Sequence, residues 1–217
     1  MNKHEVTVHI WKNDERYESV LQEGGMLPTM QGFNTGHAAL KLQEFNAEKG
    51  DYYYLSLYPD REFVPREVNG QVIQVKAGKI IGNTMPLRLG TGSLTAAGKN
   101  PKALGTSDPT KTDHTEMKKK PTTTYRFNSG LVADRILHTM KAIADNKWVW
   151  SLKELNCATA VACCLRAGGA DPLTLYYPYT AKGWTPNRLG EWCQELVEKL
   201  GGEVKREDRR RDFYDID

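Results

Sequence analysis

The chain has 217 residues, of which 39% are hydrophobic and 26% are charged. This length is enough for one well-packed domain and short for two, and the composition is typical of a soluble globular protein. The formal net charge of +3, without a dense basic stripe, is too small to indicate a nucleic-acid-binding protein. No run of about 18 apolar residues occurs, so we expect no membrane span. Residues 1–6 also lack the apolar stretch of a signal peptide.

Three segments with alternating apolar residues predict strands over residues 4–11, 37–42 and 51–59. In the first strand, Val6, Val8 and Ile10 form the face expected to be buried, and His9 and Trp11 fall on the other face. The second and third strands are separated by a polar turn at 46–50, which predicts an antiparallel hairpin. One face of that hairpin is apolar: Ala38, Leu40, Leu42, Tyr53, Leu55 and Leu57.

His37 falls on the opposite face of the predicted hairpin, together with Ser56 and Tyr58 and close to Asp60. A polar group from one of these three residues would orient its imidazole ring. The alternative for this stretch alone is a solvated histidine at the start of a strand.

A weaker strand pair is expected between residues 68 and 81. Residues 82–124 are rich in Gly, Ser, Thr, Pro and Lys and have no apolar period, so we expect an insertion or flexible loop there. This segment would interrupt a single catalytic domain over residues 1–217, with a loosely ordered tail at 206–217.

Three helices are predicted after residue 124, and with the antiparallel strands they give an α+β fold. The first begins at Asn128 or Ser129 and runs to about residue 145, with an apolar stripe of Val132, Ile136, Met140 and Ile143. The second follows Asn156, which is a good N-cap residue. The third is capped by Thr185 with Pro186 at its first position.

The four cysteines all lie in the last third of the chain, at Cys157, Cys163, Cys164 and Cys193. Their close spacing is not that of a disulfide framework and indicates synthesis in a reducing compartment. No C-x-x-C pair occurs, and we expect no metal site and no cofactor.

Cys157 falls in the first turn of the second helix, where the positive end of the helix dipole favours a thiolate. A cysteine nucleophile also needs a base, and His37 is the best candidate, oriented by Ser56, Tyr58 or Asp60. The alternative is a structural cysteine in an alanine-rich core helix. Aromatic residues, among them Tyr177 and Trp184, could line a cleft or belong to the core.

Three stretches, GHAALKL at 36–42, YLSLYP at 54–59 and LNCATAV at 155–161, resemble the circularly permuted papain-like cysteine enzymes of the NlpC/P60 superfamily. Similar proteins include bacterial effector domains delivered by type VI secretion and the Rho-inactivating domain of large multifunctional toxins. The resemblance implies a papain-like fold with Cys157 as nucleophile and His37 as base. It leaves open whether Ser56, Tyr58 or Asp60 orients the histidine.

The resemblance further implies a bacterial effector toxin that leaves its cell without a signal peptide. It would act in the periplasm of a target cell rather than in a host cytosol, and it would have an immunity protein and a secretion carrier as partners. Tyr58, Tyr177 and Trp184 are then expected to contact the substrate.

Three functions compete at this point. The first is a thiol hydrolase, an amidase or endopeptidase, that cleaves peptidoglycan stem peptides through an acyl-enzyme. The second is an acyltransferase or deamidase that modifies a host protein such as a small GTPase. The third is a non-enzymatic binding module, in which Cys157 belongs to the core and His37 to the surface.

Overall fold

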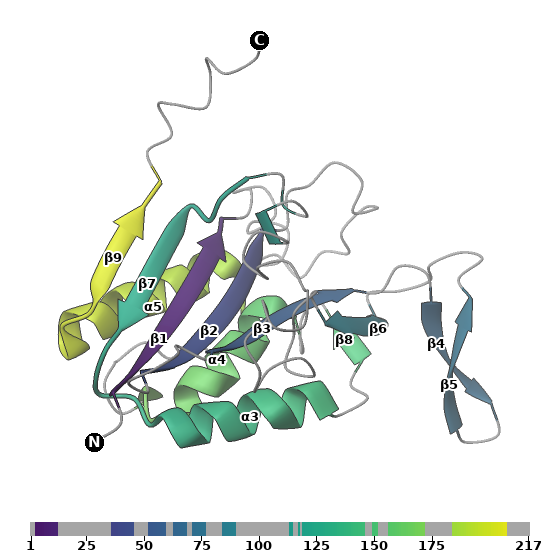
Figure 1. Ribbon diagram of the computed structural model, residues 1–217. Helices are drawn as coiled ribbons and strands as arrows, with labels where there is room; N and C mark the ends of the chain where they lie inside the picture. The colour runs from purple at the N-terminus through teal and green to yellow at the C-terminus, as the bar shows by residue number, and fades with distance from the viewer. Residues whose placement is uncertain are drawn as a thin grey trace, which may run out of the picture.

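The computed structural model describes residues 3–12, 36–45, 52–59, 63–68, 71–76, 84–89, 113–114, 117, 119–145, 149–151, 156–171 and 184–207. The fold is α+β, as the sequence predicts. Its centre is an antiparallel sheet with the strand order β8-β6-β3-β2-β1-β7-β9 (Figure 1). The strands are β1 (Lys3–Trp11), β2 (His37–Phe45), β3 (Tyr52–Pro59), β6 (Thr84–Leu89), β7 (Thr123–Phe127), β8 (Val149–Ser151) and β9 (Glu203–Arg206).

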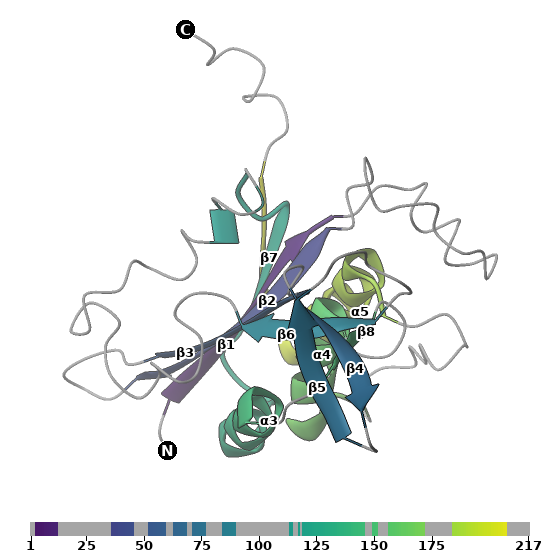
Figure 2. The same cartoon turned by 90° about the vertical axis from the view of Figure 1, so that its right-hand side faces the viewer.

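Three helices of the described chain pack on one face of this sheet (Figure 2). They are α3 (Ala133–Asp145), α4 (Cys157–Ala167) and α5 (Pro186–Leu200). The core between the two layers contains the expected apolar face of the hairpin, because β2 and β3 pair antiparallel with Leu40 opposite Leu55. On β1 the buried Val8 lies opposite Leu40, which continues the apolar face across the sheet.

The opposite face of the sheet is also buried, which the sequence analysis did not expect for the first strand. Trp11 is 0% exposed and its indole N–H donates to the carbonyl of Lys119 at 2.8 Å. The Thr122 hydroxyl donates to the carbonyl of Ile10, also at 2.8 Å. The segment before β7 therefore covers this end of β1, which is why aromatic and polar side chains lie buried there.

The segment 82–124, expected to be an insertion or flexible loop, contributes directly to the sheet. Residues 84–89 form β6 between β3 and β8, and Thr123 begins β7 next to β1. Of the tail 206–217, Arg206 ends β9, and the backbone N–H of Glu207 donates to the carbonyl of Thr122 at 3.1 Å. Residues 208–217 lie outside the described residues.

A second, two-stranded sheet consists of β4 (Phe63–Val68) and β5 (Gln71–Lys76). The weaker strand pair was expected at 68–81, so the pair lies earlier in the chain than predicted. The sequence Asn69-Gly70 between the two strands is a strong signal for a tight hairpin turn, and it explains why β5 pairs with the residues before it.

The caps of α4 and α5 agree with the sequence prediction. Asn156 and Thr185 each accept a hydrogen bond from a first-turn N–H, and Pro186 opens α5. Helix α3, in contrast, begins at Ala133 rather than at Asn128 or Ser129. The N–H of Val132 donates to the carbonyl of Gly168 at 2.9 Å, which ties the chain to the end of α4 before the helix starts. Val132 is consequently 45% exposed instead of part of the apolar stripe.

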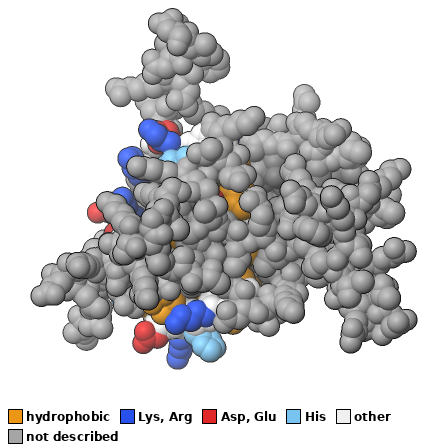
Figure 3. Space-filling model, turned by 45° about the vertical axis from the view of Figure 1, so that its right-hand side comes forward, with side chains coloured by type: hydrophobic (Ala, Val, Ile, Leu, Met, Phe, Trp, Pro, Cys, Tyr) orange, Lys and Arg blue, Asp and Glu red, His pale blue; other side chains and the backbone are white. Residues whose placement is uncertain are grey.

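Charged side chains of both signs lie together at the margins of the face drawn in Figure 3. Ion pairs of the described residues include Lys120 with Glu207 at 3.5 Å, Arg126 with Glu203 at 3.9 Å and Arg166 with Asp171 at 2.7 Å. The described surface therefore mixes both charges. Among the described residues, no helix combines the length and the apolar character needed to cross a membrane.

The end of α5 provides a test of the packing. Gly201 has a left-handed φ of 70°, with open space around the position of a Cβ, so Gly201→Ala is expected to cost about 1 kcal/mol. Gly202→Ala is expected to cost more, about 2 kcal/mol, because its Cβ would overlap the carbonyl oxygen of Arg126 on β7. Urea denaturation of the two variants measures the difference, and equal costs would show that α5 does not press on β7 at this point.

Candidate active site

Cys157 is the first residue of α4, and its position follows from the cap that precedes it. The Asn156 side chain accepts a hydrogen bond from the N–H of Thr159 at 2.9 Å, which fixes the first turn of the helix. Cys157 is half-buried. Its thiol therefore lies at the positive end of the helix dipole, in a place that a small reactant can still reach.

His37 is the first residue of β2 and is 2% exposed. Its ring lies between two aromatic rings. Tyr58 stacks on it with a centroid distance of 4.3 Å and an interplanar angle of 14°, and Trp11 lies 5.3 Å away. Trp11 is the cross-strand partner of His37 on β1. The imidazole is thus held in one plane by neighbours from both adjoining strands.

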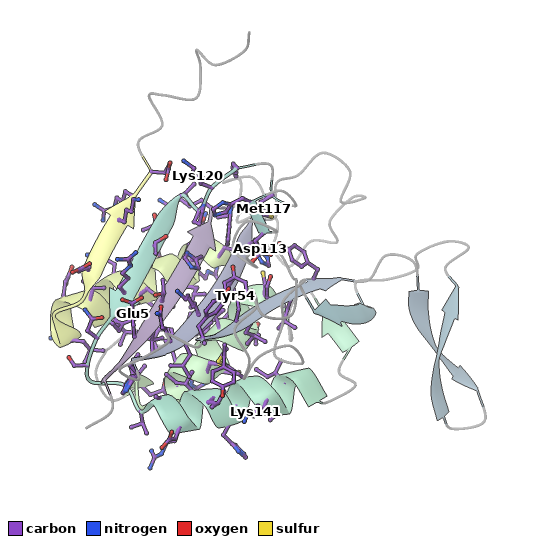
Figure 4. All side chains as sticks on the ribbon, in the orientation of Figure 1. Glu5, Tyr54, Asp113, Met117, Lys120 and Lys141 are labelled. Atoms are coloured by element: carbon purple, nitrogen blue, oxygen red, sulfur yellow. The ribbon has the colours of Figure 1, made fainter. Side chains whose placement is uncertain are left out.

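Asp113 completes the site, and the sequence analysis did not single it out. Its carboxylate accepts hydrogen bonds from Tyr54 at 2.6 Å, from Ser56 at 2.9 Å and from Tyr58 at 2.8 Å. The three donors are alternate residues of β3 and so share one face of the strand. Figure 4 labels Tyr54 and Asp113 close to each other.

The hydrogen-bond pattern fixes the protonation of the imidazole. The Ser56 hydroxyl proton goes to Asp113, so its oxygen accepts from Nε2 of His37 at 2.9 Å. Nε2 therefore carries a proton. Cys157 lies close enough to His37 to raise the pKa of the imidazole, and Nδ1 is the ring nitrogen that Ser56 leaves for the thiol. The arrangement brings a thiol, an imidazole and a carboxylate from three distant segments into one connected chain.

The electrostatics of the site favour the charged forms of His37 and Asp113. Burial by itself lowers the pKa of His37, but its interactions with the Asp113 carboxylate and with Cys157 outweigh burial and raise this pKa to about 9. Burial raises the pKa of Asp113, but the nearby charge of His37, with hydrogen bonds from Tyr54 and Tyr58, lowers it overall. Near neutral pH, His37 is therefore an imidazolium and Asp113 a carboxylate.

The other residues predicted for the site do not all lie in it. Tyr58, expected to contact substrate, lies against His37 and Asp113. The carbonyl of Trp184 accepts a hydrogen bond from Asn156, next to Cys157, at 2.8 Å, and its ring lies 5.1 Å from that of the core residue Trp192. Asp60 and Tyr177 lie outside the described residues.

The remaining cysteines are poor nucleophile candidates. Cys163 lies on the exposed side of α4, and partial desolvation of its thiol by neighbouring atoms raises its pKa. Cys164 and Cys193 are fully buried in the core, which raises the pKa of each thiol further. Within the described ranges, no group of His, Cys, Asp or Glu residues is placed to hold a metal ion.

His9, on the same face of the sheet as His37, is not suited to act as the base. Burial, followed by the charge of Lys41, lowers the pKa of His9 to about 4, so the ring stays neutral. Its Nδ1 lies 3.2 Å from the hydroxyl of Thr124 on β7.

One signal in the sequence could have pointed to Asp113. The pattern Tyr54-x-Ser56-x-Tyr58 puts three hydroxyls on one face of a strand, and buried hydroxyls need an acceptor. The pattern does not say which acceptor, because residues 82–124 contain several carboxylates and have no period that would place them.

Comparison with known proteins gives one family. The family model described as the IcsB middle domain matches residues 95–213, more than half of the chain. The matched range includes Asp113 and Cys157, whereas His37 and β3 precede it. No papain-like or NlpC/P60 family model matches the chain. No curated protein and no solved structure matches it either.

The raised pKa of His37 predicts how stability depends on pH. Because this pKa is about 9 in the folded protein against 6.5 for an unperturbed histidine, the folded state binds the proton more tightly. The resulting stabilisation is complete below pH 6.5 and is lost as the pH rises through about 9. We expect the free energy of unfolding, measured with urea, to fall over this range in the wild type and to fall less in His37→Gln. Parallel pH curves for the two proteins would contradict the assignment.

Proposed function

Since the chain belongs to the family of the IcsB middle domain, a domain of a secreted Shigella effector, we propose that it is the catalytic part of a bacterial effector and works through a covalent acyl-enzyme on Cys157. One observation carries this proposal: the connected set of Cys157, His37 and Asp113. A thiol at a helix N-terminus, a buried imidazole close to it and a buried carboxylate behind the imidazole are what nucleophilic cysteine catalysis requires.

In the first half of the proposed reaction, His37 holds the proton of the Cys157 thiol on Nδ1. The thiolate attacks the carbonyl carbon of the substrate and forms a carbon–sulfur bond, while the carbonyl oxygen becomes negative. The N–H groups of Cys157 and Ala158, in the first turn of α4, have no partners within the helix and could donate to that oxygen. The intermediate collapses, the leaving group takes the proton from Nδ1, and a thioester remains on Cys157.

In the second half, His37 takes a proton from an incoming nucleophile, which attacks the thioester carbonyl. The new bond forms, the carbon–sulfur bond breaks, and the proton returns to the Cys157–His37 pair. Asp113 stays ionised throughout and stabilises the imidazolium. The same machinery therefore serves a hydrolase, when the nucleophile is water, and a transferase, when it is an amine of a protein.

The comparison favours a protein substrate. The matching family is that of a domain from a secreted effector. Of the two enzymatic hypotheses, the modification of a host protein by acyl transfer or deamidation is therefore our first proposal. We further propose a permuted papain-like fold, supported by the histidine strand β2 that precedes the cysteine helix α4 and by the contact between them.

Peptidoglycan hydrolysis is the second candidate. It is favoured by the order of the histidine strand and the cysteine helix, which is the order of the NlpC/P60 enzymes that the sequence resembles. Expression in bacteria with and without export to the periplasm, and in the cytosol of eukaryotic cells, separates the two. Toxicity confined to exported protein would support the hydrolase, and toxicity confined to the eukaryotic cytosol would support the first proposal. In either case Cys157→Ala is expected to abolish the effect.

The chain contains an internal competition that tests activation of Cys157. Cys163 is exposed and Cys157 is only half-buried, so exposure alone predicts faster alkylation of Cys163. If the imidazolium and the helix N-terminus activate Cys157, iodoacetamide at neutral pH labels Cys157 first, by about tenfold or more. Site-resolved mass spectrometry of briefly labelled native protein measures the ratio.

His37→Ala is the matched control for this competition. It should reverse the order of labelling and leave the rate at Cys163 unchanged, because Cys163 does not contact the site. Faster labelling of Cys163 in the wild type would instead support the binding-module hypothesis, in which Cys157 is a packing residue.

Formation of the acyl-enzyme can be observed without knowing the substrate. An activated ester such as p-nitrophenyl acetate is expected to add one acetyl group to Cys157, detected by intact mass and removed by hydroxylamine. His37→Ala should slow acylation by about 100-fold, the usual contribution of a positioned base. Adduct formation at equal rates in wild type and His37→Ala would count against the proposed mechanism. Addition of water or of a protein amine to the acylated enzyme then shows which acceptor is used.

A further inference from the structure

On the face of β3 next to Asp113, three hydroxyl groups donate to the carboxylate, whereas a simple catalytic triad needs only the bond from the imidazole. In such a triad the carboxylate accepts directly from the imidazole. Here the distance from Nε2 of His37 to Oδ2 of Asp113 is 3.6 Å, too long for a hydrogen bond, and Ser56 lies within 2.9 Å of both His37 and Asp113.

We infer that Ser56 is a positioning residue that relays the charge of Asp113 to His37, in a chain Cys157–His37–Ser56–Asp113. The inference rests on the proposed function for the meaning of Cys157, but the relay itself is a property of the buried hydrogen bonds. Within this chain His37 and Ser56 each have a partner on either side, and Ser56 links the carboxylate to the imidazole.

The direction of each hydrogen bond supports the relay. A serine hydroxyl has one proton, and in Ser56 this proton is used for Oδ1 of Asp113. The oxygen of Ser56 can then only accept from Nε2–H of His37. Because Nε2 of His37 has a single proton, it cannot donate fully to Asp113 at the same time.

Tyr54 and Tyr58 explain why the carboxylate does not turn to meet the histidine. Oδ1 of Asp113 already accepts from Ser56 and Tyr58, and Oδ2 accepts from Tyr54 at 2.6 Å. Rotation of the carboxylate would break these bonds in a site where Asp113 is 1% exposed. All three hydroxyls donate, which favours the ionised carboxylate over the protonated acid.

The histidine is equally restricted. Tyr58 stacks on one side of the His37 ring and Trp11 packs near it at 5.3 Å. A rotation of the ring that brought Nε2 closer to Asp113 would also move Nδ1 away from Cys157. Ser56 therefore links His37 and Asp113 across a distance that neither side chain can shorten without losing its other contacts.

The relay requires a hydroxyl group at residue 56. Without the hydroxyl, Nε2–H would lose its acceptor inside a buried site, and the imidazolium would lose its link to the negative charge. Ser56→Ala is therefore expected to lower the pH at which His37 titrates and to slow the reaction of Cys157. Ser56→Thr keeps a hydroxyl at the same place and is the conservative rescue.

The titration of His37, followed by NMR of the labelled imidazole, is the deciding measurement. The titratable groups that face this ring are Cys157 from α4, Tyr58 from β3 and Asp113. We expect Ser56→Ala to lower the titration midpoint by about one pH unit or more. Ser56→Thr should restore most of the shift, and Ser129→Ala, at an exposed position outside the site, should leave the midpoint unchanged.

The rate of Cys157 alkylation by iodoacetamide is the second readout, and it separates the relay from the proposed function. A lowered His37 midpoint with about tenfold slower alkylation in Ser56→Ala supports both. A lowered midpoint with no change in alkylation supports the relay and counts against Cys157 as the activated nucleophile. An unchanged midpoint in folded Ser56→Ala, checked by its thermal midpoint, overturns the relay, because Asp113 would then act on His37 directly.

Discussion

A buried carboxylate is costly unless it is paired and hydrogen-bonded, and among the described residues Asp113 is a carboxylate that is only 1% exposed. Three hydroxyls of β3 supply its hydrogen bonds, and the imidazolium of His37 supplies its counter-charge. The Asp113 carboxylate therefore connects its own segment with strand β3 and with the first residue of β2. The site depends on this assembly, because removing the carboxylate would leave three buried hydroxyls and a buried cation without their partner.

The two faces of the sheet differ in composition: one forms the apolar core and the other carries most of the site. The helix face is apolar and provides the main core, including the buried side of α4 that carries Cys157 at its start. The opposite face carries Trp11, His37 and Tyr54, buried under the segment that leads to β7. Cys157 and His37 can meet because one is the first residue of its helix and the other the first residue of its strand. Both elements are rigid, so the distance between thiol and imidazole is set by packing.

Membership in an effector family and a cysteine–histidine–aspartate site are the two observations behind the proposal that this protein changes its target covalently. The chemistry of an acyl-enzyme leaves the choice of acceptor open, since the same imidazole serves water and amines. What selects the acceptor is the surface around the thiol rather than the catalytic groups. The geometry of the site therefore does not distinguish the proposed modification of a host protein from hydrolysis of peptidoglycan.

Local patterns in the sequence determined the strands β1 to β3 with their apolar face, the caps of α4 and α5, and the placing of Cys157, His37, Ser56 and Tyr58. Each of these depends on neighbours within a few residues, through the two-residue period of a strand or the free N–H groups of a helix end. The burial of Trp11, the role of Asp113 and the later start of α3 were decided only by the tertiary structure. They depend on a segment without periodicity that docks on residues over 50 positions away in sequence, or, for α3, on a backbone hydrogen bond to the end of another helix. Such contacts leave no local pattern, because the requirement of a buried charge or carbonyl for a partner does not specify where in the chain that partner lies.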